Sequence, residues 1–382
     1  MDIRLTEDQV EISRQARRFC ENECPAELAR AAYDDPNRFT DALWQKMAEM
    51  GWTAMLLPEE YDGLNLDLMD LAVVLEEMGR TVCPGPFVST VLMFGELLKA
   101  AGNADQKAKY LPRLASGELK GSVALTEADA GADLSYIQMP AQADGDGYVI
   151  SGTKMFVTDA QSADALIVCA RTEPGNDEAK GLTLFVVDLP NDSVKITPLV
   201  TMDGARRQGA VEFKGLRLGP DSVLGEPGRA WSLMQKALAR VYVGLSAETV
   251  GAAQRAMEIA HEYAKIRVQF DQPIGSFQAV KHMCAEMYME TESARSLMYW
   301  AAWAQDHGDE TEALMSAQAV KAYCTECAKG VAEKTIQVLG GTGFTWEHDA
   351  HLYLKRIKSN EVLLGDPSYH REQVLRLVQP LP

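Results

Sequence analysis

Apolar residues recur at spacings of three and four over residues 5–117, which is the period of an amphipathic helix. The pattern is clear in EDQVEISRQARRF, LMDLAVVLEEMG and VSTVLMFGELLKAAG. Glycines and prolines such as Gly51, Pro58 and Gly102 separate these runs, as expected for the turns between helices. This part of the chain predicts an antiparallel helical lobe.

The period changes near Gly121, where short segments typical of β-strands begin. They read GYVISGTKMFVTD, DALIVCART, LTLFVVDL, VKITPLV and AVEFKGLRL, and Asp, Gly, Pro and Asn residues separate them. Because no helical segment lies between them, an antiparallel sheet or barrel is favoured over a parallel nucleotide-binding sheet.

Helical periodicity returns after Gly228, over residues 231–266, 276–306 and 310–339. Alanines at many of these positions allow helix axes to approach closely, which favours an antiparallel bundle. The sequence therefore predicts the α+β class in three parts. We expect an N-terminal helical domain at 1–120, a middle antiparallel β domain at 121–225 and a C-terminal four-helix-bundle domain at 226–382.

The formal net charge of -18 argues against nucleic acid and anionic membranes as partners, because both require a basic surface. An anionic ligand would need local donors. The first residues, MDIRLTEDQV, lack the pattern of a secretory signal, and no apolar run approaches the roughly 20 residues that span a bilayer. We therefore expect a cytoplasmic protein that does not bind membranes.

Seven cysteines in a chain of this kind favour reduced thiols over a disulfide framework. Cys324 and Cys327 form a CxxC pair, and His348 and His351 form an HxxH pair, as in some zinc sites. Each pair lies in a strongly helical context, where residues three apart simply share a face. We predict no metal site.

Four segments carry residue types that suit ligand binding, although each has an ordinary structural interpretation. In ALTEADAGADLS, residues 124–135, Thr126 offers a hydroxyl and Gly131 permits a tight turn, but the segment also suits a domain junction. In SGTKMFVTDA, residues 151–160, Phe156 and Thr158 alternate with Val157 and would line one wall of a strand together. A core strand explains the same pattern.

The third segment, RVQFDQPIGSFQ, places Arg267 after a long helix, where a guanidinium grips phosphate or serves as a solvated cap. The fourth, QVLGGTGFTWEHD, has Gly340, Gly341 and Gly343. It follows a helix and not a strand, so a Rossmann dinucleotide loop is excluded. A glycine-rich helix end that lets the backbone approach a ligand remains open.

The order and spacing of these four segments resemble the acyl-CoA dehydrogenase superfamily over essentially the whole chain. The family pattern runs ALTEPxAGSD, a strand ending Trp-Ile-Thr, RxxFGxPI with a following FQ, and QxxGGxG. The resemblance implies a tetramer with FAD across a subunit interface. The isoalloxazine would lie near Leu125, Thr126, Phe156 and Thr158, and the adenine and pyrophosphate of a neighbouring subunit's FAD near Arg267, Phe270, Gln278, Gln337, Gly340 and Gly341.

The resemblance also implies a reaction, the oxidation of an acyl-CoA thioester to the 2,3-enoyl-CoA with electrons leaving to an electron-transferring flavoprotein. In the family a carboxylate removes the α-proton while the β-hydride passes to flavin N5. At the two positions where family members keep this base, the chain has Val241 and Leu364. Neither side chain accepts a proton.

Further departures are Asp271 in place of Gly, where it repels a phosphate or pairs with Arg267, together with Asp366 in place of Thr and Ala132 in place of Ser. Two carboxylates are candidate substitutes for the base: Glu361, three residues before Leu364, and Glu248, seven residues after Val241. Each is also explained as a solvated or ion-paired helix residue.

Two functions stay open from the sequence. The chain is a dehydrogenase with a relocated base, active as a homotetramer, or it is the base-lacking subunit of a heterotetrameric acyl-CoA dehydrogenase that completes a shared FAD site. The ending TWEHDAHLYLKRIKSNEVLLGD resembles such partner subunits, which act on bulky steroid side chains or dicarboxylates. A same-fold protein of different chemistry, or one without flavin, is the third class.

Overall fold

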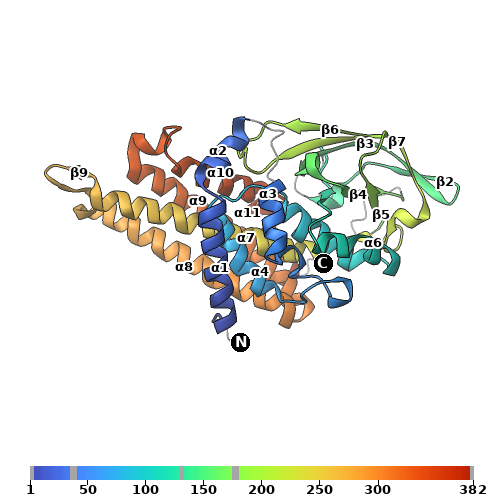
Figure 1. The fold of residues 1–382 in the computed structure, drawn as a ribbon, viewed down its shortest axis with the longest axis horizontal. Coiled ribbons are helices and arrows are strands. Elements are labelled where there is room, and N and C mark those ends of the chain that lie inside the picture. The colour runs from blue at the N-terminus through green and yellow to red at the C-terminus, as the bar shows by residue number, and fades with distance from the viewer. Residues whose placement is uncertain (1–3, 35–40, 130–132, 174–179, 379–382) are drawn as a thin grey trace. The chain divides into compact units, whose positions relative to one another are not determined.

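The protein is described by a computed structural model over residues 4–34, 41–129, 133–173 and 180–378 (Figure 1). The chain divides into two compact units. The helical unit comprises residues 1–34, 68–84 and 242–382, and the sheet unit comprises residues 35–67 and 85–241. The division falls inside the longest helix, between Val241 and Tyr242. The predicted boundaries of three domains stay a prediction.

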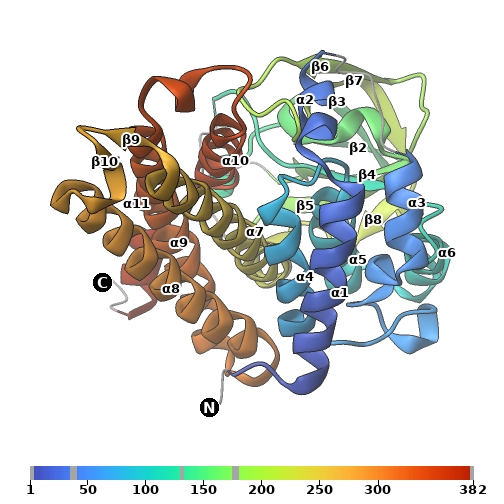
Figure 2. The same cartoon turned by 60° about the vertical axis from the view of Figure 1, so that its left-hand side comes forward.

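Long antiparallel helices dominate the helical unit, and Figures 1 and 2 show α8 and α9 running side by side. Helices α10 and α11 pack against α9. The chain enters α1 through a capping box, in which Thr6 accepts a hydrogen bond from the Gln9 amide and Gln9 accepts one from the Thr6 amide. The helices of this unit are α1 (Glu7–Glu23), α2 (Ala26–Asp34), α4 (Leu68–Arg80), α7 (Ala230–Ile266, from Tyr242 on), α8 (Gln278–His307), α9 (Glu310–Leu339), α10 (Ala350–Val362) and α11 (Pro367–Val378).

Helices α4 and α7 approach so closely that their backbones touch at two glycines. A Cβ added at Gly79 of α4 would lie 1.9 Å from the carbonyl oxygen of Glu248, and one at Gly251 of α7 would lie 1.8 Å from that of Glu76. Each glycine therefore makes room for the other helix, and this crossing places Glu248 against α4.

The sheet unit combines two four-stranded sheets with short helices. One sheet has the order β1 (Gly121–Ala124), β4 (Ala165–Arg171), β5 (Leu182–Asp188), β8 (Val223–Leu224). The other has the order β2 (Ala141–Asp144), β3 (Gly147–Thr158), β7 (Gln208–Leu218), β6 (Val194–Leu199). The helices are α3 (Asp41–Glu49), a π-helix (Val88–Phe94), α5 (Gly95–Ala101) and α6 (Ala104–Ala115).

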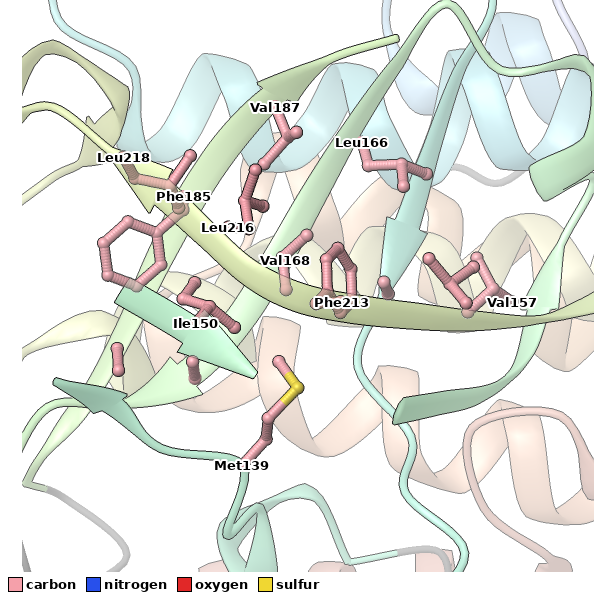
Figure 3. Packing of buried hydrophobic residues seen from close by; sticks show 14 of the residues in the cluster. Met139, Ile150, Val157, Leu166, Val168, Phe185, Val187, Phe213, Leu216 and Leu218 are labelled. Atoms are coloured by element: carbon pink, nitrogen blue, oxygen red, sulfur yellow. The ribbon is translucent and has the colours of Figure 1, made fainter. Parts of the chain in front are cut away.

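The core of the sheet unit is formed by apolar side chains from both sheets, as Figure 3 shows. Ile150 and Phe213 come from β3 and β7, whereas Val168 and Phe185 come from β4 and β5. Burial of such side chains contributes about 1.5–3 kcal/mol each to folding.

The predicted α+β class, with helical, β and helical parts in chain order, is confirmed. The antiparallel prediction fails for one pair, since β1 and β4 are parallel with Gly121 opposite Ala165. The reason lies in the connection: after β1 the chain passes through β2 and β3 of the other sheet before it returns as β4. A connection of that length allows two neighbouring strands to run in the same direction.

In the described part of the chain, no helix is both long and apolar enough to cross a membrane.

Candidate active site

The first two candidate segments are hydrogen-bonded to one another in the sheet unit. The amide of Met155 donates to the carbonyl oxygen of Thr126 at 2.8 Å. Lys154 Nζ donates to the carbonyl oxygen of Leu125 at 2.9 Å and to Glu127 Oε1 at 2.6 Å. Lys154 is fully buried, and burial lowers its pKa. A buried ion pair thus fixes the segment after β1 against β3.

The bulge in β3 changes how Phe156 and Thr158 are presented. Lys154 pairs with Val211 and Val157 with Gly209, so β3 has an extra residue there, and Phe156 has φ +56°. The expected period of two is wrong at this point. Phe156 is 49% exposed, whereas Thr158 is 1% exposed. That both side chains line one ligand wall stays a prediction.

Thr158 has a buried hydroxyl oxygen with no hydrogen-bond partner among the residues that the structure describes. Leaving a buried polar group unsatisfied costs about 1–3 kcal/mol, so such groups usually mark a position that a ligand or water completes. Its backbone is held in place, because Ser122 Oγ donates to the Thr158 carbonyl at 2.5 Å. The position is therefore suited to a polar ligand atom.

The third segment forms a small hairpin between α7 and α8, made of β9 (Val268–Gln269) and β10 (Gln272–Pro273). Figure 1 shows it at the end of the long helices. Phe270 at its tip is 87% exposed, and Arg267 and Gln278 are also exposed. Among the described residues, no ion pair joins Arg267 to Asp271. The hairpin thus carries an exposed guanidinium and an exposed aromatic ring, and the Phe270 ring packs edge-on against Phe277.

The fourth segment opens onto a cavity of about 360 Å³ in the helical unit. Gly340 has φ +60° and ψ -139°, a conformation that only glycine adopts readily. A Cβ at Gly340 or Gly341 would meet no other atom within 4 Å, so the backbone there is open to a ligand. The cavity is lined by Glu333, Ile336, Gln337, Gly340, Gly341, Phe344 and Leu354.

The two positions where the resemblance places a base are apolar and buried. Val241 is fully buried, and Leu364 is 8% exposed with φ +60°. Leu364 lies in the segment that follows α10, and Lys321 of α9 holds this segment. Lys321 Nζ donates to the carbonyl oxygens of Asn360 at 2.8 Å, Glu361 at 3.2 Å and Gly365 at 3.1 Å.

Lys321 and His370 lie beside the segment that holds Leu364, and no sequence motif pointed to either residue. Both are fully buried, and burial lowers the pKa of Lys321 to about 7. Burial, with Lys321 nearby, lowers the pKa of His370 to about 2, so the imidazole stays neutral. Its Nδ1 lies 2.5 Å from Gln318 Oε1, and its ring packs edge-on against Tyr242. The one sequence signal is a lysine inside the apolar run SAQAVKAYC.

The first substitute carboxylate, Glu248, is buried in an ion pair. Its Oε1 accepts a hydrogen bond from Arg356 at 2.7 Å, and its Oε2 accepts one from Asn360 Nδ2 at 2.9 Å. Arg356 is 1% exposed and also donates to the carbonyl oxygen of Cys83 at 3.2 Å. Glu248 therefore joins α7 to α10.

The second substitute, Glu361, is paired as well. Its Oε1 accepts a hydrogen bond from Lys329 Nζ at 2.5 Å, and α10 is still helical at this residue. The helix ends at Val362, Leu363 is extended and Leu364 has φ +60°, so the expected separation of one helical turn between Glu361 and Leu364 does not hold. Neither substitute is a free carboxylate, and the assignment of a base to either stays a prediction.

Across the described ranges, no group of three His, Cys, Asp or Glu residues is arranged to hold a metal ion. Cys324 donates to the carbonyl oxygen of Ala294 inside the bundle. His348 lies in the turn before α10 and not on a helix with His351, because α10 begins at Ala350. The helical interpretation of HxxH was wrong, and the absence of a metal stays a prediction. Gly131 and Ala132 lie outside the described residues.

Three models of acyl-CoA dehydrogenase domains match the chain in succession: the N-terminal domain at residues 6–118, the middle domain at 122–216 and the C-terminal domain at 228–379. The bovine mitochondrial short-chain specific acyl-CoA dehydrogenase is 30% identical over 374 residues, which cover 97% of this chain and 89% of that protein. This chain belongs to the acyl-CoA dehydrogenase family.

Solved structures support the same assignment. Butyryl-CoA dehydrogenase from Megasphaera elsdenii has a TM-score of 0.90 at 25% identity and covers 98% of both chains. A variant of the Tcur3481-Tcur3483 steroid ACAD has a TM-score of 0.87 at 28% identity and covers 97% of this chain and 98% of that chain.

The family is FAD-dependent, and the residues of this chain fit that cofactor. The Thr158 hydroxyl, which has no hydrogen-bond partner among the described residues, is predicted to lie on the isoalloxazine side. The open backbone at Gly340 and Gly341 is predicted to lie on the adenine and pyrophosphate side.

Proposed function

We propose that this chain is the base-lacking subunit of a heterotetrameric, FAD-dependent acyl-CoA dehydrogenase that converts an acyl-CoA thioester to the 2,3-enoyl-CoA. The observation that carries the proposal is the state of the four positions considered for a base. Val241 and Leu364 are apolar, and Glu248 and Glu361 are both held in ion pairs. A second, different subunit would then supply the carboxylate.

The burial of Glu248 argues most strongly against a catalytic role. Removing one member of a buried ion pair costs about 3–5 kcal/mol, because an uncompensated charge is left behind. A base that left Arg356 and Asn360 in order to reach a substrate would incur a cost of this kind. Glu248 is better explained as a structural residue that ties α7 to α10.

FAD would be held by two separate groups of residues, each serving a different flavin. Leu125, Thr126, Phe156 and Thr158 lie on the isoalloxazine side of one flavin. When bound, FAD supplies the hydride acceptor of the reaction. The adenine and pyrophosphate of a neighbouring subunit's flavin would meet Arg267, Phe270, Gln278, Gln337, Gly340 and Gly341.

In this arrangement Arg267 would supply the positive charge that the FAD diphosphate needs. The chain has a net charge of -18, so a diphosphate must be met by local donors. Arg267 is exposed beside the hairpin and can grip phosphate oxygens in bidentate fashion. We propose an electron-transferring flavoprotein as electron acceptor and the cytoplasm as location.

The Tcur3481-Tcur3483 steroid ACAD supports the heteromeric proposal, because its name joins two components and it matches this chain over nearly its full length. A steroid-type acyl group is the substrate class that this similarity favours. A second candidate function is a self-sufficient enzyme that uses Glu361. It is favoured by the place of Glu361 in the last turn of α10, three residues before Leu364 in sequence.

The test compares the chain expressed alone with the chain expressed together with a candidate second subunit encoded beside it. We expect the single chain to be inactive towards acyl-CoA with an artificial electron acceptor, and the coexpressed complex to be flavin-loaded, tetrameric and active. Flavin absorbance, light scattering and acceptor reduction report these three properties separately.

Installing a base sharpens this test. Leu364→Glu should create or raise turnover in assemblies that contain flavin, whereas Leu363→Glu, one residue away and equally buried, should not. The heteromeric proposal is overturned if the single chain is yellow, tetrameric and active, and if Glu361→Gln then lowers turnover more than tenfold, about 1.4 kcal/mol.

A further inference from the structure

Three cysteine side chains lie close together in the helical unit, outside the candidate active site. Cys24 caps the C-terminal end of α1, and its sulfur lies 3.3 Å from that of Cys83, which follows α4. Cys20 lies one helical turn before Cys24, and interaction between their thiols shifts the pKa of both. All three are free and buried. Cys24 is therefore the middle member of a row of three sulfurs.

A cavity of about 330 Å³ reaches this row from one side. Cys20 and Cys24 are among its lining residues, and Cys83 is not. Polar donors share the lining, among them Thr81, Arg17 and Arg80. A small polar solute in the cavity thus meets Cys24, while Cys83 contacts Cys24 from outside the lining.

The interactions among the three thiols make them unequal. The interactions of Cys24 with Cys20 and Cys83 lower the pKa of Cys24 to about 5. The same interactions, together with burial, raise the pKa of Cys20 and of Cys83. The thiolate is the nucleophilic form of cysteine, so Cys24 is the reactive member and its neighbours remain thiols.

We propose that Cys24 and Cys83 form a peroxide-sensitive dithiol, in which Cys24 reacts with a small hydroperoxide and Cys83 resolves the product to a disulfide. In the first step the Cys24 thiolate attacks the peroxide, an S–O bond forms and the O–O bond breaks. Sulfur loses two electrons, and the other peroxide oxygen takes them and leaves, after protonation, as water or an alcohol. In the second step the Cys83 thiol attacks the sulfenic sulfur, an S–S bond forms and water leaves. With hydrogen peroxide, two thiols give one disulfide and two waters.

The position of the pair gives the disulfide a structural effect. It would join the end of α1 to the segment after α4, two elements that are 59 residues apart in sequence. Cys83 also accepts a hydrogen bond from Arg356 through its carbonyl oxygen. Oxidation of Cys83 would thus affect a residue that is hydrogen-bonded to Arg356, the partner of Glu248 in the buried ion pair. The proposal is independent of the flavin and of the heteromeric function.

The experiment treats the full-length protein with hydrogen peroxide, blocks the remaining thiols by alkylation and maps the peptides by mass spectrometry. We expect a Cys24–Cys83 disulfide that dithiothreitol reverses. In Cys83→Ser, Cys24 should instead accumulate as a sulfenic acid that dimedone captures. In Cys24→Ser, neither product should form.

Cys284 provides the matched control, because it is partly exposed and its thiol makes no hydrogen bond to any other described residue. Cys284→Ser should leave the disulfide unchanged. The proposal is overturned if peroxide oxidises Cys284 while Cys24 and Cys83 stay reduced, or if the disulfide that forms excludes Cys24. The disulfide map of the unaltered protein tests the proposal even where a variant folds poorly.

Discussion

Arg356 and Glu248 form an ion pair from which water is nearly excluded. Such a pair contributes little net stability compared with well-packed apolar residues, because both charges lose their hydration on burial. Its members are nevertheless dependent on each other. The ion pair keeps the Glu248 carboxylate from acting as a free base. For the same reason, loss of Arg356 would leave a buried, unpaired charge at Glu248.

Arg356→Met should lower the free energy of unfolding by about 3–5 kcal/mol, because Glu248 would remain buried without its cation. Adding Glu248→Gln should restore part of the loss, since the amide still accepts hydrogen bonds. Urea unfolding of both single variants and the double variant gives the interaction free energy between Arg356 and Glu248. A single Glu248→Gln variant of full stability that abolishes turnover would instead identify Glu248 as the base.

Lys321 should make the stability of the protein depend on pH in the alkaline range. Burial lowers its pKa to about 7, whereas an ordinary lysine has a pKa of about 10.4. Between these values the unfolded chain binds more protons than the folded protein, so the free energy of unfolding rises with pH. Below about pH 7 both states are protonated and the full destabilising contribution is present.

Lys321→Met should remove the rise of the free energy of unfolding with pH. Relative to the variant, the unaltered protein should gain about 1.4 kcal/mol of stability per pH unit between roughly pH 7.5 and 10. Lys329→Met is the control, because the pKa of Lys329 is raised by its hydrogen bond to Glu361 and the sign is opposite. Equal pH profiles for the unaltered protein and Lys321→Met would contradict the prediction.

The motif spacing predicts that Val241 and Leu364 occupy the positions of the usual bases, and this stays a prediction. Both residues are apolar and buried. The partner of Glu248 was not predictable, because Arg356 lies 108 residues away and no local pattern links the two. Long-range pairing of charges depends on how helices cross, which periodicity does not specify.

At the scale of elements, long helices were predicted almost to the residue, since residues 231–266, 276–306 and 310–339 correspond to α7, α8 and α9. Their period of apolar residues is maintained over many turns. The bulge in β3 and the parallel pairing of β1 were missed, because both depend on strands that are distant in sequence. Local alternation does not encode such pairing.

The crossing of α4 and α7 gives a prediction at this scale. Gly251→Ala should destabilise the protein by more than 1 kcal/mol, because the new methyl group would overlap the carbonyl oxygen of Glu76 and force the helices apart. Gly330→Ala in α9 is the control. There a Cβ meets only Glu290 Oε2 at 3.7 Å, and alanine stabilises a helix by up to about 1 kcal/mol relative to glycine.

The thermal unfolding temperature should therefore fall for Gly251→Ala and rise for Gly330→Ala, although both substitutions exchange glycine for alanine inside a long helix. A stabilised Gly251→Ala protein would mean that the two helices separate easily. The result also bears on Glu248, because its own carbonyl oxygen lies against Gly79 at the same crossing.

At the scale of the whole molecule, the residues predicted to bind FAD fall into two groups. Leu125 and Thr158 are buried in the sheet unit and Phe156 is half-exposed there, whereas Arg267 and Phe270 are exposed at the hairpin of the helical unit. An exposed aromatic residue next to an exposed cation contributes little to the stability of a single chain. The hairpin therefore has the properties expected of a surface that contacts another subunit and its cofactor.

Arg267→Gln should accordingly lower the flavin content of the purified assembly several-fold without lowering the unfolding temperature of the flavin-free chain. The physical reason is that the substitution removes a phosphate-binding charge but no internal contact. Lys265→Gln, which removes an exposed positive charge two residues away, is the control and should retain flavin. Because the contact is ionic and exposed, added salt should weaken flavin retention in the unaltered protein more than in Arg267→Gln. Equal flavin loss in both variants would indicate an effect of net charge alone and would remove Arg267 from the proposed FAD site.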